Sequence, residues 1–230
     1  MGEYILAQSY VVPAVHHALM EIYLQRLFPQ RGDIPAIIDE LWKSVVVCCR
    51  ERAWHNLTHV GFMLNMFNFF LRHCSAEEKE YFDGMLKKDV ILAVFMHDFV
   101  QEPGAEDNEK SCCSFVRKMF FGQRNNVERV CACIMATKHD HWGKTPEEKL
   151  IADLDLAILG SFDPMLYDKY KNGIREEYSA YDDETWRKGR TEVLRQFLQR
   201  KTIFQTDFFC ERYEEQARRN ILGELKALNR

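Results

Sequence analysis

The sequence has no internal repeat, no low-complexity run and no segment with the composition of a linker. These absences argue against a modular array and favour a single domain over all 230 residues. Signals for β-strands are nearly absent as well. Hydrophobic residues make up 47% of the chain and aromatic residues 13%, which is enough for a sizeable core and excludes a disordered chain.

A surplus of positive charge is also missing. The chain has 31 Lys and Arg residues against 35 Asp and Glu residues, a formal net charge of −4. Proteins that bind nucleic-acid backbones without sequence preference use a basic surface. We therefore expect no general nucleic-acid binding, although local basic patches are compatible with this charge.

Long apolar runs and secretory features are missing too. The most apolar stretch, residues 62–71, is interrupted by Asn65 and Asn68 and is too short to span a bilayer. The first residues show no basic n-region of a signal peptide. The eight cysteines show no C-x-x-C zinc signature, so we expect reduced, mostly buried thiols. These features predict a cytoplasmic protein that does not associate with membranes.

Apolar residues instead recur every three or four positions, which is the spacing of amphipathic helices. Residues 75–78 and 145–148 have the pattern of capping boxes that open helices, and Asp107 or Asn108 is expected to cap another. The predicted helices cover residues 15–27, 33–45, 60–71, 108–119, 126–138, 146–158, 164–178, 184–199 and 207–228, and a further segment leads from residue 76 towards residue 97. The fold class predicted is all-α.

The apolar run from Val90 to Phe99 contains an adjacent histidine and aspartate, His97 and Asp98. A charged carboxylate at the end of such a run is costly to bury unless something pairs with it. A divalent metal would take the imidazole nitrogen and the carboxylate oxygen as ligands. The alternative is a helix end at which both side chains face water.

Three other segments carry side chains of the types that ligate metals, and one of them, residues 137–141, contains His139, Asp140 and His141 just beyond an apolar helix. His55 and His59 are four residues apart, so they share a helix face if that turn is helical. Asp153 and Asp155 interrupt an otherwise apolar helix, and buried acids of this kind need a cation or strong hydrogen-bond donors.

The order of a histidine, a His-Asp pair and a later aspartate resembles the signature of the HD superfamily of metal-dependent phosphohydrolases. Residues 52–60, Arg-Ala-Trp-His-Asn-Leu-Thr-His-Val, are similar to the opening "R-x-Y-H-N-L-x-H-I" of a subfamily described as predicted metal-dependent HD phosphohydrolases. Similar agreement follows in order at residues 95–98, 107–111, 136–139, 153–160, 174–178, 189–194 and 197–200. The sequence departs from the pattern at Trp54 and Gln101, where tyrosine is usual or frequent, and the second departure affects the expected substrate contacts.

The resemblance implies a single-domain helical bundle of the HD type. Leading helices would occupy residues 1–50, the metal-ligand core residues 51–160, and helices that complete the pocket residues 161–230.

The resemblance also implies four metal ligands, His59, His97, Asp98 and Asp155. Asp155 is preferred over Asp153 because the last aspartate of the family directly precedes an apolar "L-A" turn. Two imidazoles and two carboxylates suit divalent Mn, Fe, Zn, Ni or Mg better than a thiolate-seeking metal. A metal at such a site activates water and polarises a phosphoryl group.

Further residues are candidates for catalysis and for phosphate binding, because charge that develops on the phosphoryl oxygens calls for nearby cations and donors. Asp98 is expected to orient the attacking water. The catalytic candidates are Asp98, Glu109 and Lys138, and the substrate-binding candidates are His55, Lys110, His139, Arg187 and Arg190. The alternatives are structural: a turn cap for His55, a surface charge for Glu109 and a salt bridge for Arg190.

The expected function is hydrolysis of a phosphate ester or anhydride of a nucleotide or a similar small phosphorylated metabolite. One alternative is a non-catalytic HD-fold module that binds a nucleotide and regulates a partner. Another is a di-metal HD-fold oxygenase, which needs two further histidine ligands; only His139 and His141 are available, and they are too close together to resemble that pattern well. The identity of the substrate, the metal and its number, and the oligomeric state stay open.

Overall fold

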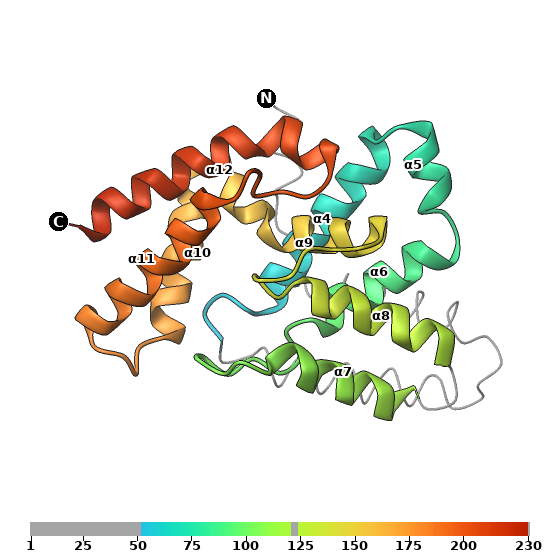
Figure 1. The fold of residues 1–230 in the computed structure, drawn as a ribbon, viewed down its shortest axis with the longest axis horizontal. Coiled ribbons are helices and arrows are strands. Elements are labelled where there is room, and N and C mark those ends of the chain that lie inside the picture. Colours follow the sequence, from blue (N-terminus) through green and yellow to red (C-terminus); the bar gives the residue numbers. More distant parts are fainter. Residues whose placement is uncertain (1–51, 121–123, 230) are drawn as a thin grey trace.

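The computed structural model describes residues 52–120 and 124–229, and every regular element within these ranges is a helix (Figure 1). The elements are α4 (Leu57–His73), α5 (Ala76–Tyr81), α6 (Met85–Met96), α7 (Asn108–Met119), α8 (Arg124–Ala136), α9 (Pro146–Leu156), the short 3-10 helix η1 (Ala157–Gly160), α10 (Pro164–Glu177), α11 (Asp183–Gln199) and α12 (Asp207–Leu228). The all-α prediction is confirmed. The helices predicted at residues 15–27 and 33–45 lie outside the described residues.

Two predicted helix starts are confirmed by their caps. Before α5, the Ser75 hydroxyl accepts a hydrogen bond from the Glu78 backbone, and the Glu78 carboxylate accepts one from the Ser75 backbone. Before α9, the Thr145 hydroxyl accepts a hydrogen bond from Glu148, and Pro146 fills the first helical position. These bonds satisfy backbone N–H groups that the first turn of a helix leaves free.

Asp107, one of the two predicted caps, occupies the N-cap position of α7, but its side chain makes no capping hydrogen bond. The Asp107 carboxylate pairs instead with Lys110 Nζ at 2.5 Å. The Asn108 amide binds the preceding loop, where its oxygen accepts a hydrogen bond from the Glu102 backbone at 3.1 Å. Both candidate caps are therefore engaged by groups outside the helix backbone, because short polar side chains bind whichever local partner is nearest.

The core is built around α6 and η1. All residues from Val90 to His97 are buried, and α6 packs against α4, α8 and α9. The buried η1 packs against α10 and α12, so that the C-terminal helices share the same cluster of apolar side chains. In Figure 1, α11 and α12 lie on the left and α5 and α6 on the right, with α9 between them. The chain positions α9 and η1 where both groups of helices meet.

Two further findings bear on expectations from the sequence. The cysteines within the described ranges are free thiols, and Cys112, Cys113, Cys131 and Cys133 are buried. No helix among residues 52–120 and 124–229 has the length and apolar character needed to cross a membrane.

Candidate metal centre

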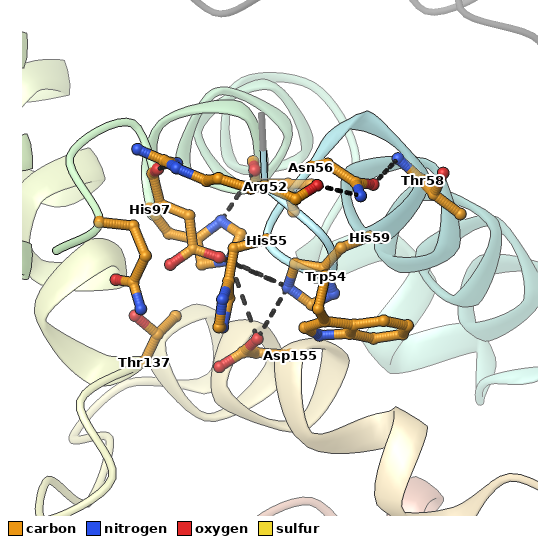
Figure 2. A network of polar contacts seen from close by, with 12 residues as sticks. Arg52, Trp54, His55, Asn56, Thr58, His59, His97, Thr137 and Asp155 are labelled. Atoms are coloured by element: carbon orange, nitrogen blue, oxygen red, sulfur yellow. Dashed lines mark hydrogen bonds and ion pairs between the residues drawn. The ribbon is translucent and has the colours of Figure 1, made fainter. Parts of the chain in front are cut away.

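The turn that precedes α4 positions His55 and His59. The Asn56 side chain accepts a hydrogen bond from the first turn of α4 and donates two to the backbone carbonyls that precede it (Figure 2). Because α4 begins at Leu57, His59 lies within the helix and His55 lies before it. The two histidines therefore do not share a helix face. Their rings meet edge to face with centroids 6.0 Å apart.

The turn after α6 holds His97 and Asp98. The Arg52 guanidinium donates hydrogen bonds to the backbone carbonyls of Asp98 and Phe99. From α7, the Cys112 thiol donates to the backbone carbonyl of His97 at 3.1 Å. Tertiary contacts thus fix the backbone where the helix ends, and both side chains face α4 and α9.

Four side chains from three parts of the chain converge at one point (Figure 2). His59 Nε2 lies 3.0 Å from Asp155 Oδ1 and 3.2 Å from His97 Nε2. His97 Nε2 lies 2.9 Å from Asp98 Oδ2 and 3.7 Å from Asp155 Oδ1. The ligand atoms of His59, His97 and Asp98 all lie within 4.8 Å of one another, so this group can hold a metal ion.

Two polar atoms show that these residues fit a divalent cation. His97 Nδ1 lies 2.9 Å from the Val94 carbonyl, a contact that keeps a proton on Nδ1, so that Nε2 is the nitrogen that can lose its proton and face a cation in the cluster. Asp98 Oδ2 is buried and faces His97 Nε2 at 2.9 Å. Once that nitrogen has lost its proton, the buried oxygen has no donor, which is costly, and a cation among these four side chains would remove that cost.

Asp153 and Asp155 have different surroundings, although they are only two residues apart on α9. The Asp153 carboxylate is completely buried and accepts hydrogen bonds from Gln205 N at 2.7 Å, Thr206 N at 2.8 Å and Thr206 Oγ1 at 2.6 Å. It therefore ties α9 to the start of α12. Positions two apart on a helix point in nearly opposite directions. The geometry consequently groups Asp155, and not Asp153, with the histidines.

The two carboxylates of the cluster determine its charge. Burial disfavours a charged imidazole, but the fields of Asp98 and Asp155 outweigh it and raise the pKa of His97 to about 9. Burial likewise opposes charge on Asp98 and Asp155, yet the adjacent histidines hold the pKa of both carboxyl groups below the usual range. The cluster thus presents two carboxylates to a cation, which must displace a proton from His97.

This pKa shift predicts how the stability of the metal-free protein depends on pH. The pKa of His97 is raised from 6.5 to about 9 in the folded state. Its stabilising contribution is therefore fully present below pH 6.5 and is lost as the pH rises through about 9. Urea unfolding in the presence of a chelator should give a lower free energy of unfolding at pH 9 than at pH 6.5. The decrease should be smaller in a His97→Gln variant; an equal decrease would contradict the assignment.

A cavity of about 380 Å³ opens beside the cluster. Asp155 lines it, together with the predicted residues His55, His139 and Arg190. Sequence reasoning missed the rest of the wall, which combines aliphatic side chains with aromatic ones from α10, α11, the turn between them and the turn before α4. The aromatic lining residues are Trp54, Tyr170, Tyr178, Tyr181 and Trp186. Helix periodicity assigns such residues to the core, and only the tertiary structure, in which α10 packs on η1 and α11 on α12, shows that they face a cavity.

His55 is held in the cavity wall by Glu177 of α10. The Glu177 carboxylate accepts hydrogen bonds from the backbone N–H groups of Trp54 at 2.6 Å and His55 at 2.8 Å, and it contacts His55 Nδ1 at 2.5 Å. Burial opposes charge on His55, but Asp98 and then Glu177 outweigh it and raise its pKa. With Nδ1 committed to Glu177, His55 has Nε2 available for the cavity.

The Glu177→Ala variant should lower the free energy of unfolding by about 2–4 kcal/mol, because it leaves buried backbone donors without an acceptor. Urea denaturation measures this change. Glu176→Ala is the matched control, since Glu176 is exposed on the same helix. The control should stay within about 0.5 kcal/mol of the parent protein. Equal stabilities of the two variants would contradict the anchoring role of Glu177.

The other histidines differ in position. His139 packs its ring against Phe197, with centroids 5.2 Å apart, and the surrounding protein lowers its pKa by disfavouring the charged form. It is therefore a neutral donor or acceptor at the cavity wall. His141 is exposed and pairs with Asp140 at 2.9 Å, so it does not join the cluster.

Of the three cationic substrate-binding candidates, Arg190 lines the cavity, whereas Lys110 and Arg187 do not. Arg190 is buried and pairs with Glu224 at 2.7 Å, so the cavity wall contains an arginine whose charge is already compensated. Lys110 is exposed and bound to Asp107, and Arg187 lines a separate polar groove. Neither belongs to the cavity lining.

Glu109 is influenced by the charges of Lys138 and of the two aspartates of the cluster. Burial raises the pKa of Glu109, the field of Lys138 lowers it, and the fields of Asp98 and Asp155 raise it further. Glu109 therefore keeps a proton more readily than an exposed glutamate, which is a property of general acids. Glu109 and Lys138 stay candidates for catalysis.

Comparisons with models of protein families, with curated proteins and with solved structures gave no match for this chain. The resemblance to the HD superfamily therefore stays a prediction, and the function is inferred from the geometry of the site.

Proposed function

We propose that this protein is a metal-dependent phosphohydrolase of the HD type that cleaves a phosphate ester or anhydride of a small organic metabolite. His59, His97, Asp98 and Asp155 would hold one divalent metal. The observation that carries the proposal is the convergence of these two imidazoles and two carboxylates beside a cavity of about 380 Å³. Cavities from about 300 Å³ upwards are typical of small-molecule sites.

The donor set suits divalent Mn, Fe, Zn, Ni or Mg, because imidazole nitrogen and carboxylate oxygen serve all of these ions. When bound, such a metal supplies a Lewis acid for the phosphoryl oxygens and lowers the pKa of water. The chain supplies the orientation: the Val94 carbonyl fixes the tautomer of His97, and Arg52 fixes the turn that carries Asp98. Histidine ligands oriented in this way are typical of functional metal sites.

The neighbouring side chains have separate proposed roles. The buried Oδ2 of Asp98, which lies 2.9 Å from His97 Nε2, can orient the attacking water and accept its proton. His55, whose Nδ1 is engaged by Glu177, can donate from Nε2 to a phosphoryl oxygen. His139, which also lines the cavity, can donate or accept without adding charge. Glu109 is the proposed proton donor to the leaving group.

The test is metal analysis combined with a substrate screen. The purified protein is stripped of metal, loaded in turn with each of the five ions, and assayed for release of phosphate or pyrophosphate from a panel of phosphorylated metabolites. We expect about one metal per chain and turnover with at least one ion. Binding of panel compounds without turnover, together with an Asp98→Ala variant that binds them equally well, would replace the hydrolase by a non-catalytic binding module.

A further inference from the structure

The cavity beside the metal cluster has a wall of aromatic rings. Trp54 and Tyr170 meet edge to face with centroids 5.0 Å apart. Tyr178 contacts both Trp186, at 5.4 Å, and Tyr181, at 5.8 Å. All five residues line the cavity, as does Asp155 of the metal cluster. One cavity therefore joins a polar end that suits phosphate to an aromatic wall that suits a flat organic group.

The aromatic wall is held in place by polar contacts behind it. Arg175 donates a hydrogen bond to the Tyr178 carbonyl at 2.9 Å, pairs with Asp183 at 2.8 Å, and lies over the Trp186 ring at 5.6 Å. On the other side, Gly173 allows α10 to approach Trp54 closely, since a Cβ there would lie 3.0 Å from Trp54 Cβ. A wall positioned before the ligand arrives loses less entropy when the ligand binds.

The cationic side chains of the cavity wall already have anionic partners. Arg190 is held by Glu224 through two contacts, at 2.7 and 3.2 Å, and His55 is held by Glu177. His139 packs against Phe197, and its surroundings lower its pKa by disfavouring the charged form. The part of the chain that the structure describes contributes no lysine to the lining. A polyphosphate chain carries several negative charges and needs dedicated cations, whereas a single phosphate can be neutralised at the metal cluster.

We propose that the substrate is a phosphate monoester of a flat, uncharged aromatic group, with one phosphate at the metal cluster and the ring against Trp54, Tyr178 and Trp186. This inference rests on the proposed function and names its substrate class. In the reaction, the oxygen of water forms a new bond to phosphorus and the ester P–O bond breaks. The electron pair of that bond stays with the departing ester oxygen, which takes up the proton that Glu109 donates, while Asp98 accepts the proton of the attacking water. The products are inorganic phosphate and the free hydroxyl compound.

The first experiment compares kcat/KM of the metal-loaded protein for four substrates: 1-naphthyl phosphate, glycerol phosphate, and a purine nucleoside monophosphate with its triphosphate. We expect 1-naphthyl phosphate and the nucleoside monophosphate to exceed glycerol phosphate by about 5- to 150-fold, the range expected for stacking of one ring. The triphosphate should be the poorer of the two nucleotides. A preference for glycerol phosphate or for the triphosphate would overturn the inference.

Variants test the aromatic wall itself. Trp186→Ala should raise KM for 1-naphthyl phosphate by about 5- to 150-fold, while KM for glycerol phosphate changes little. Trp186→Phe should restore much of the affinity, which also shows that the site folds. Trp142→Ala is the matched control, since Trp142 is 52% exposed and outside the cavity lining. Equal losses for both substrates would overturn the inference.

A binding measurement separates this inference from the proposed function. Phenylphosphonate and methylphosphonate have no hydrolysable ester bond, and calorimetry gives their affinities for the metal-loaded protein. Tighter binding of phenylphosphonate without turnover of any ester would support the aromatic wall and overturn the hydrolase. Turnover of esters with equal binding of the two phosphonates would support the hydrolase and overturn the aromatic wall.

Discussion

The His97→Ala variant is expected to lose its metal and its phosphatase activity together. His97 is in close contact with Asp98 and lies 3.2 Å from His59, so its imidazole occupies the centre of the proposed ligand set. Its removal also leaves the buried Asp98 Oδ2 without its 2.9 Å contact to the imidazole. Changes in residues that only support a ligand already cost about 10- to 100-fold in affinity or activity. We therefore expect metal affinity and kcat/KM each to fall by more than about 100-fold.

Metal content measured by mass spectrometry, together with kcat/KM on the best substrate of the screen, checks this expectation. His141→Ala is the control, because His141 is an exposed histidine paired only with Asp140. It should retain full metal and activity. If His97→Ala kept one metal per chain, the ligand assignment would be wrong. If it lost the metal but kept its activity, the metal would have no part in turnover.

The Asp153→Ala variant is expected to lose about 3–5 kcal/mol of folding free energy. Removing the Asp153 carboxylate leaves the backbone N–H groups of Gln205 and Thr206 and the Thr206 hydroxyl without an acceptor. Buried donors without a partner cost about 1–3 kcal/mol each. Gln205 and Thr206 lie directly before α12, which packs on η1. The loss should therefore lower the stability of the whole core and not only unfold one helix end.

Chemical denaturation measures this loss of folding free energy, and two further variants serve as comparisons. Asp207→Ala removes an exposed acid from the first turn of α12 and should cost less than about 1 kcal/mol. Asp155→Ala should leave the stability of the metal-free protein closer to that of the parent but abolish metal binding. The opposite pattern, with metal lost in Asp153→Ala and stability lost in Asp155→Ala, would exchange the roles of the two aspartates.

Much of the fold could be predicted because helix formation depends on local pattern. The predicted helix at residues 207–228 matches α12, and those at 164–178 and 184–199 differ from α10 and α11 by one residue at an end. Apolar spacing and helix caps depend on residues that are close in sequence, so they can be recognised without the tertiary structure. The start of α7 shows the limit: Asp107 takes the predicted N-cap position, but its carboxylate pairs with Lys110 and makes no hydrogen bond to the helix backbone.

The sequence alone identified the residue types of the candidate site, and their order suggested a metal. Histidine and carboxylate side chains within apolar helices are costly to bury without partners, and that cost is visible in the sequence. The tertiary structure decided which of them meet. Asp155 contacts His59, whereas Asp153 binds the backbone at the start of α12. His55 lies before α4 and so does not share a helix face with His59, and Arg190 forms a salt bridge with Glu224. The tertiary structure also assembled the aromatic wall from α10 and α11, because the facing of side chains across a cavity depends on how helices pack and not on spacing within one helix.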